Sequence, residues 1–223
     1  MLLVLIVFTA CGNGPDAVRI RDKGLGLDAL VFTIPPEQNK GFVFLDVPER
    51  SGDFRITAHW DSDKYALMIN GGYFDQAFAP VGLCRINGKV VNETVSENLS
   101  GFVALDEGGC LYVLTRDDDL DAYSSIIQAG PYVVDPGGKV GIRTRSEMKA
   151  ARTLVGVTTE GVVVVVVVTE PITLYDLARG IKKELPEIER LLNLDGGPST
   201  ALKTGAHEVV NVGPVRNYIA LTK

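Results

Sequence analysis

Residues 153–168 have the sequence TLVGVTTEGVVVVVVV, which is the strongest structural signal in the chain. An apolar run is followed by the turn-like triplet Thr159-Glu160-Gly161 and then by seven consecutive valines. A strand with one face in water alternates apolar and polar residues, so an unbroken valine run predicts a central strand covered on both faces. Seven residues are far too few for a membrane span, which needs about 20. We expect two paired interior strands here.

Outward from this pair, most of the chain also has strand character. Residues 29–34 and 41–47 are apolar runs separated by Pro35 and Pro36, typical of a hairpin or meander. Residues 66–69 predict a short buried strand. Asn87-Gly88 joins residues 84–86 to residues 90–91, and this dipeptide is a strong hairpin signal. Residues 102–105 and 111–114 predict a second hairpin.

Helices are expected in two places. Thr173 is a good N-cap, Asp176 approximates a capping box, apolar residues then recur at helical spacing, and Pro186 ends the pattern. Residues 187–192 predict a second, short helix. We therefore expect an α+β fold, with a large mixed or antiparallel β-sheet system and a few covering helices.

Length and composition indicate one globular domain. The chain has 223 residues, 46% hydrophobic and 22% charged, and a net charge of −6. This length supports one well-buried core. The acidic balance argues against binding nucleic acid or an anionic membrane through a basic surface. An anionic substrate would need a local cation, and Arg152 is the leading candidate.

The first residues predict export. Residues 1–10 are almost wholly apolar and precede Cys11, which resembles a bacterial lipobox cysteine in a lipoprotein signal peptide. We expect Cys11 to be lipidated and to hold the protein at the membrane of a bacterial cell envelope. Residues 11–16 would be a tether and residues 17–223 a single domain. The apolar run lacks a preceding Lys or Arg, and a buried N-terminal strand is the alternative.

Two apolar segments end in a polar residue and a double glycine. Residues 193–200 are NLDGGPST and residues 70–75 are NGGYFD. Glycine lets a backbone approach a ligand closely. A carboxylate beside exposed N–H groups and hydroxyls can handle a water molecule and an anionic oxygen together. Each motif alone is also compatible with a simple turn.

Together with AARTLVGV at residues 150–157 and QAGP at residues 128–131, these motifs resemble the phosphodiester glycosidase family. The resemblance runs from about residue 66 to the C-terminus. It implies a hydrolase that cleaves the sugar–phosphate bond of a glycosyl phosphodiester, of the N-acetylglucosamine-1-phosphodiester type, in envelope or host glycans. Pro198 stands where a third glycine is expected, which removes one N–H donor.

The implied reaction assigns roles to the charged residues. Asp195 would activate water or stabilise the oxocarbenium-like sugar. Arg152 would hold the phosphate, because a guanidinium group matches two phosphate oxygens. Asp75 would be a second catalytic carboxylate or would orient Asn70. Tyr73 or Phe74 is a candidate for the floor of the sugar site, and the alternative is that these aromatic residues belong to the core.

The remaining candidates would bind substrate through backbone N–H groups and hydroxyls. They are Asn70, Gly71, Gly72, Gly196, Gly197, Ser199 and Thr200.

Structural alternatives stay open for the same residues. Arg152 could pair with Asp195 without substrate, Asn70 could bond its own turn, and Ser199 and Thr200 could cap a following turn.

No cysteine or histidine cluster has zinc spacing, and we expect no cofactor. A disulfide between Cys84 and Cys110 is possible after export, and so are two free thiols. A non-catalytic carbohydrate-binding lipoprotein and a structural envelope lipoprotein are the competing functions.

Overall fold

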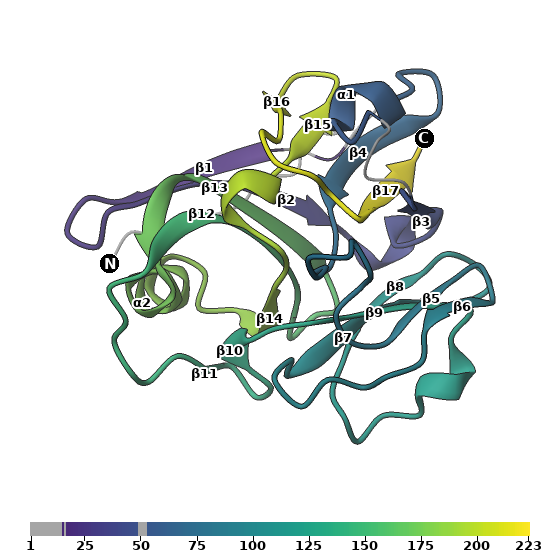
Figure 1. Cartoon of the computed structure of the whole chain (residues 1–223). Helices are drawn as coiled ribbons and strands as arrows, with labels where there is room; N and C mark the ends of the chain where they lie inside the picture. The colour runs from purple at the N-terminus through teal and green to yellow at the C-terminus, as the bar shows by residue number, and fades with distance from the viewer. Residues whose placement is uncertain (1–14, 16, 49–52) are drawn as a thin grey trace.

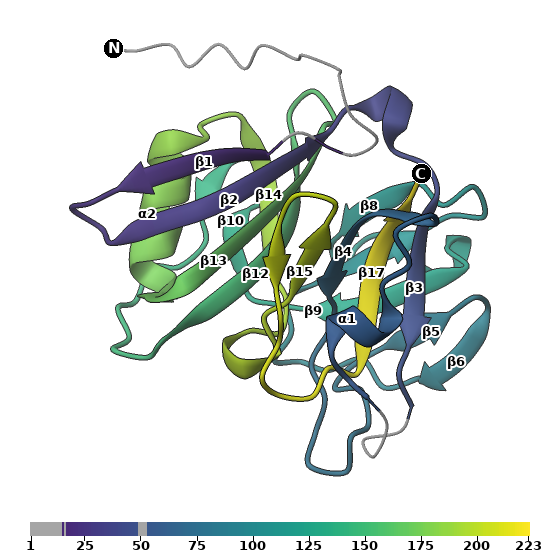
Figure 2. The ribbon, with the colours of Figure 1, turned by 90° about the horizontal axis from the view of Figure 1, so that it is seen from above.

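The computed structural model describes residue 15 and residues 17–48 and 53–223. Within these ranges the fold is mostly β, with seventeen strands and two α-helices. The strands form three antiparallel sheets, and the long strands of the largest sheet run side by side next to the two smaller sheets (Figures 1 and 2). The expected antiparallel sheet system is present, although helices contribute less than the term α+β suggests.

The seven-stranded sheet has the order β1 (Ala17–Asp22), β2 (Leu27–Ile34), β13 (Val163–Thr173), β12 (Lys149–Thr158), β14 (Ile188–Asn193), β10 (Tyr132–Asp135), β11 (Lys139–Val140). One five-stranded sheet has the order β16 (Glu208–Val209), β15 (Leu202–Thr204), β4 (Tyr65–Asn70), β17 (Asn217–Thr222), β3 (Phe42–Asp46). The other has the order β6 (Lys89–Asn92), β5 (Cys84–Ile86), β9 (Ser125–Ala129), β7 (Gly101–Leu105), β8 (Leu111–Leu114). The helices are α1 (Ile56–His59) and α2 (Leu174–Glu184), with short 3-10 turns η1 (Pro36–Gln38), η2 (Leu120–Ala122) and η3 (Gly197–Ser199).

The valine run is an interior strand, as predicted. β13 pairs with β12 on one side and with β2 on the other. Val163, Val165 and Val167 face a core shared by all three sheets, and the intervening valines face the helix α2. Each valine from 163 to 168 is at most 2% exposed. Both faces of the strand are therefore buried, which explains why polar residues are absent from this run.

The first predicted helix is confirmed as α2, which packs on one face of the seven-stranded sheet (Figure 1). The Thr173 hydroxyl accepts the N–H of Asp176 at 3.0 Å and donates to its carboxylate at 2.8 Å. The cap thus satisfies an N–H group that has no partner inside the helix. Leu177, Ala178 and Ile181 are buried against the sheet.

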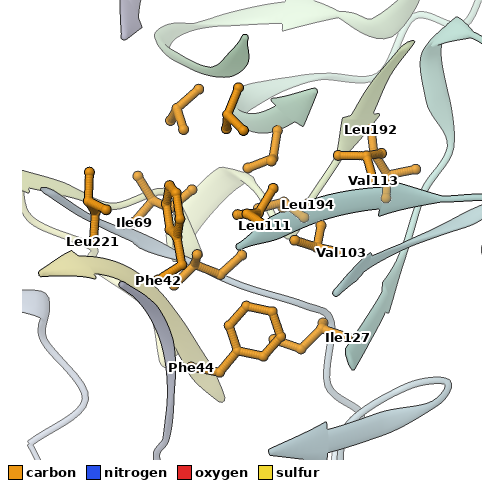
Figure 3. Close-up of a cluster of buried hydrophobic side chains, with 14 of the residues drawn as sticks. Phe42, Phe44, Ile69, Val103, Leu111, Val113, Ile127, Leu192, Leu194 and Leu221 are labelled. Atoms are coloured by element: carbon orange, nitrogen blue, oxygen red, sulfur yellow. The ribbon is translucent and has the colours of Figure 1, made fainter. Parts of the chain in front are cut away.

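The main core lies where the three sheets meet, and Figure 3 shows its side chains. Phe42, Phe44 and Leu221 come from one five-stranded sheet, Val103 and Ile127 from the other. Leu192 on β14 and Leu194 directly after it extend from the seven-stranded sheet into the same cluster. This packing fixes the position of the β14 end relative to the other two sheets.

Two sequence predictions of local structure are wrong. Residues 187–192 do not form a helix; they belong largely to β14, which pairs with both β12 and β10. A short apolar segment has too little periodicity to separate helix from strand, and pairing on both sides decides the outcome. Residues 29–34 and 41–47 do form strands, but β2 and β3 lie in different sheets and do not form a hairpin.

The Asn87-Gly88 hairpin is confirmed as β5–β6, and both turn residues have positive φ, 51° and 77°. The second hairpin is confirmed as β7–β8. Cys84 is buried, Cys110 is partly exposed, and both are free thiols. The predicted signal peptide and the lipidated Cys11 lie outside the described residues. Among the helices of the described ranges, none has the length and apolarity that crossing a membrane requires.

Candidate active site

The four sequence motifs meet where the three sheets adjoin. Asn70 ends β4, Gly130 follows β9, and Asp195 follows β14, so each sheet contributes one strand end. Asn70 Nδ2 donates to Asp195 O at 2.8 Å, and the Tyr73 hydroxyl donates to Gly130 O at 2.9 Å. These bonds span 125 and 57 residues of sequence, so the motifs converge through tertiary structure.

The side chain of Asn70 is fully buried and connects separate segments of the chain through hydrogen bonds. Its Oδ1 accepts the Thr153 hydroxyl at 2.6 Å and the N–H of Ala201 at 3.0 Å, while Nδ2 holds the Asp195 carbonyl. It does not bond its own turn. The Asn70 amide therefore positions the loop that carries Asp195, and its side-chain oxygen is already occupied by two protein donors.

The Gly71 and Gly72 N–H groups are not available to a substrate. Gly71 N donates to Asn217 O and Gly72 N donates to Asn217 Oδ1, each at 2.8 Å. A Cβ on Gly71 would lie 2.0 Å from Asn217 Oδ1, and one on Gly72 would lie 2.5 Å from Ile127 Cγ2. These glycines permit close packing, and the expectation that their N–H groups donate to phosphate is wrong because a backbone N–H carries one hydrogen.

The Asp195 backbone is held on both sides. Its N–H donates to Gly71 O at 3.1 Å, and its carbonyl accepts Asn70 Nδ2. The carboxylate is partly buried and accepts the N–H of Gly196 at 2.8 Å. Burial raises the pKa of the Asp195 carboxyl, while the neighbouring Ser199 hydroxyl and the Gly196 N–H act in the opposite direction. A carboxyl group with a raised pKa is a better proton acceptor than an ordinary aspartate.

The loop after Asp195 lies against the strand that carries Arg152. A Cβ on Gly196 would lie 2.7 Å from Ala151 O and 3.8 Å from the Arg152 Cα. Gly197 has φ +58°, a conformation that favours glycine. Both glycines therefore have conformational or packing reasons to be present, and the second of them begins η3.

The two hydroxyls of this loop are buried and neither caps η3. Ser199 Oγ donates to Pro214 O at 3.0 Å, and the same hydroxyl lies close enough to the Asp195 carboxylate to lower its pKa. A hydroxyl has one hydrogen, so it serves one of these two acceptors at a time. Thr200 Oγ1 is buried and has no hydrogen-bond partner. Thr200 is therefore the one of the pair whose hydroxyl has no hydrogen-bond partner among the described residues.

Arg152 is a buried cation without an acidic partner. It lies on β12 opposite Val168, is 8% exposed, and its Nε is buried without a hydrogen bond. It takes part in none of the ion pairs formed by the described residues, so the alternative of an Arg152–Asp195 pair is not realised. Burial lowers the pKa of Arg152. An unpaired buried charge is costly, and an anionic ligand would offset that cost.

Tyr73 and Asn193 are further parts of the site; the sequence suggested Tyr73 for the floor of the sugar site or for the core, and it assigned no role to Asn193. Asn193 Nδ2 donates to the Tyr73 hydroxyl at 2.5 Å. Burial raises the pKa of Tyr73, the negative charge of Asp195 raises it further, and the positive charge of Arg152 opposes this. The Tyr73 hydroxyl is thus within electrostatic reach of both charged candidates. Asn193 was visible only as the polar end of an apolar run, without any signal for the direction of its side chain.

Asp75 is placed differently from the expected second carboxylate. It is exposed, and its Oδ1 accepts the N–H groups of Ala77 and Ala79, both at 2.9 Å. This is the local hydrogen bonding by which aspartate closes a turn. In the described part of the chain Asp75 forms no hydrogen bond with Asn70 or Asp195.

Comparison with known proteins identifies relatives of this chain. A sequence model of the phosphodiester glycosidase family (NAGPA) matches residues 63–222. The uncharacterized protein YigE of Escherichia coli K12 is 29% identical over 144 residues, which cover 58% of this chain and 55% of YigE. The chain thus matches about half the length of that relative.

Solved structures share the fold. The zebrafish N-acetylglucosamine-1-phosphodiester alpha-N-acetylglucosaminidase catalytic domain, auto-inhibited by its pro-peptide, matches with a TM-score of 0.64 at 17% identity, over 93% of this chain and 82% of that one. A hypothetical protein from Synechocystis matches with a TM-score of 0.70 at 13% identity, over 92% and 61% of the two chains. A putative exported protein from Burkholderia pseudomallei gives 0.63 at 13% identity, over 87% and 74%.

Proposed function

Because the chain belongs to the phosphodiester glycosidase family, we propose that it hydrolyses the bond between a sugar and phosphate in a glycosyl phosphodiester. The observation that carries this proposal is the buried Arg152 guanidinium, which has no acidic partner and lies on the strand against which the Asp195 loop packs. A cation of this kind is suited to a phosphate group.

The proposed reaction places water on the anomeric carbon. The carbon–oxygen bond to phosphate breaks, its electron pair leaves with the phosphate monoester, and the water proton passes to the Asp195 carboxylate. The second pKa of a phosphate monoester is about 6, so this leaving group departs without prior protonation. A strong general acid is therefore unnecessary, and the chemical demand shifts to neutralising phosphate charge.

Arg152 supplies that charge in the proposal. Its fixed fork of N–H donors fits two phosphate oxygens, and its low exposure strengthens the interaction because less water screens it. Thr200 Oγ1, which is buried without a hydrogen-bond partner among the described residues, is a further candidate donor, and the Gly197 N–H is another. Asn70, Gly71 and Gly72 act by positioning Asp195.

The finer substrate assignment extends the family resemblance. We propose N-acetylglucosamine-1-phosphodiesters of envelope or host glycans as the first substrates to examine. The cellular placement rests on residues 1–12, where an apolar run precedes Ala10-Cys11-Gly12, and we propose an exported protein held at the bacterial membrane through lipidated Cys11.

The proposal is tested by incubating the purified domain with GlcNAc-, glucose- and mannose-1-phosphodiesters and measuring free sugar and phosphate monoester. We expect turnover of at least one of them, with no phosphate monoester released when the substrate is a sugar-6-phosphodiester. Glycan binding without turnover across the panel would replace the hydrolase with a non-catalytic carbohydrate-binding protein.

A further inference from the structure

The amide of Asn193 has a fixed orientation. Nδ2 donates to the Tyr73 hydroxyl at 2.5 Å and to Leu194 O at 2.8 Å. A backbone carbonyl only accepts, so the nitrogen must face Leu194, and both amide hydrogens are used. The direction of Asn193 Oδ1 is therefore determined by the protein.

The Asn193 backbone is also tied down. Its N–H donates to Pro131 O at 3.0 Å, and its carbonyl accepts the N–H of Gly130 at 2.9 Å. The residue is 1% exposed. Neither the main chain nor the amide can turn without breaking several hydrogen bonds.

Asn193 Oδ1 is nevertheless buried without a donor. Most buried side-chain polar atoms have a hydrogen-bond partner, and an unsatisfied one costs free energy. The tyrosine, the carbonyl and the strand pairing around Asn193 hold this oxygen in place while leaving it unsatisfied. An atom held in this way is suited to accept a hydrogen bond from a ligand.

The position of Asn193 puts this acceptor beside the charged candidates. Asn193 is in register with Leu154 on β12, so its side chain lies on the same side of the sheet as Leu154. Side chains alternate along a strand, so Arg152, two residues before Leu154, lies on that side as well. The Tyr73 hydroxyl, which Asn193 bonds, responds to the charges of both Arg152 and Asp195.

We propose that Asn193 Oδ1 accepts a hydrogen bond from a hydroxyl or amide N–H of the bound sugar and thereby determines which sugar the site takes. This inference rests on the proposed function, since it supplies the sugar contact of the same site. An acceptor without hydrogens repels an anionic oxygen, so the phosphate belongs to Arg152 and a neutral donor belongs to Asn193.

The first test uses the wild-type protein and a series of sugar-1-phosphodiesters that each lack one ring substituent capable of donating. We expect one of them to lose at least about tenfold in kcat/KM relative to the parent, because it leaves Asn193 Oδ1 unpaired. Equal rates across the series would overturn the proposal, and this arm does not depend on the folding of any variant.

The second test assigns that selectivity to Asn193. The Asn193→Ala substitution should lower kcat/KM for the parent substrate by about ten- to a hundredfold. It should lower kcat/KM for the critical deoxy analogue little further, because that analogue already lacks the group that pairs with Asn193 Oδ1. Asn193→Asp keeps an acceptor oxygen and should retain discrimination between the two substrates. Tyr73→Phe is the matched control, since it removes a partner of Nδ2 and leaves Oδ1, so its loss should be the same for both substrates.

Failure of this inference is distinguishable from failure of the proposed function. Turnover with independent losses for Asn193→Ala and the deoxy analogue would keep the hydrolase and reject the sugar contact. If the wild type shows no turnover, Kd is measured in place of kcat/KM. Wild type and Asn193→Ala are then compared for binding a non-hydrolysable C-glycosyl phosphonate and its deoxy forms. Coupling in Kd would support the contact, and additive effects or no binding would reject it.

Discussion

The side chain of Asn70 donates a hydrogen bond to the backbone carbonyl of Asp195 at 2.8 Å, across two different sheets. The reciprocal contact runs from Asp195 N to Gly71 O. The loop bearing the candidate catalytic carboxylate is thus fixed by the end of a strand from another sheet. A rigid backbone beneath a reactive side chain reduces the reorganisation needed during catalysis.

Asp195→Asn should abolish most activity while keeping the shape of the site. The amide can still accept the Gly196 N–H, but it lacks the charge and basicity needed for water. We expect kcat on a sugar-1-phosphodiester to fall by at least about a hundredfold, the lower range for a positioned acid–base group. Asp75→Asn is the matched control, because Asp75 closes an exposed turn, and its rate should stay close to wild type. A larger loss of kcat in Asp75→Asn than in Asp195→Asn would assign the catalytic role to Asp75 instead of Asp195.

The same substitution should stabilise the fold at neutral pH. Burial raises the pKa of Asp195 above 3.8 in the folded protein, so the ionised form is disfavoured by folding. The contribution of the Asp195 carboxyl group to the free energy of unfolding is fully present below pH 3.8. It is lost as the pH rises through the pKa that this group has in the folded protein. Asp195→Asn should therefore melt at a higher temperature than wild type at pH 7, and the difference should shrink on acidification. A lower Tm for the variant at pH 7 would contradict this.

Arg152→Met should separate phosphate recognition from sugar recognition. The methionine fills a similar buried volume without charge, and we expect kcat/KM on a phosphodiester to fall by roughly ten- to a hundredfold, as for a lost charged hydrogen bond. A neutral aryl glycoside should be affected much less, which the ratio of the two rate constants measures. Arg145→Met, at a side chain that is 62% exposed, is the control. Equal losses on both substrates would remove the phosphate role.

Val165→Asp should destroy cooperative unfolding. Val165 is 1% exposed on the interior strand β13, and an aspartate there would bury a charge without a partner at a cost of several kcal/mol. Val212, which is 84% exposed, provides the control, and Val212→Asp should leave the thermal melt nearly unchanged. An unaltered Tm in Val165→Asp is incompatible with the burial of this strand.

Cys11→Ser should release the protein from the membrane. Cells grown with a fatty-acid analogue should label the wild-type protein and not the variant, because the variant lacks the acceptor thiol. Fractionation should then recover the labelled protein with membranes. Equal labelling of both proteins, or no label in wild type, would remove the lipid anchor from the proposal.

Where one local pattern had one structural solution, the sequence predicted the fold well. Valines 163–168 could only be covered on both faces, and Thr173 with Asp176 marked the start of α2. The helix prediction for residues 187–192 was wrong because helix and strand differ here in pairing with distant strands. A short stretch of sequence contains no information on that pairing. The same limitation affected β2 and β3, because β2 pairs with the distant β13 as well as with the adjacent β1, and β3 pairs with the distant β17.

The sequence identified most residues of the site, but it did not predict the role of each. Asp195 and Arg152 were visible as charged residues beside apolar strands. The commitment of Gly71 and Gly72 to Asn217 was not visible, because a double glycine fits both close packing and ligand binding. Asn193 was missed because its importance lies in an unpaired oxygen, which only the tertiary environment reveals.

The strand β17 follows every other element of the described chain, yet it lies between β4 and β3 in its sheet (Figure 2). Its first residue, Asn217, bonds both Gly71 and Gly72. The β4 end therefore depends on a residue that lies 145 positions further along the chain than Gly72. A chain that stops before residue 217 would carry both Arg152 and Asp195 and still lack the two hydrogen bonds that hold Gly71 and Gly72.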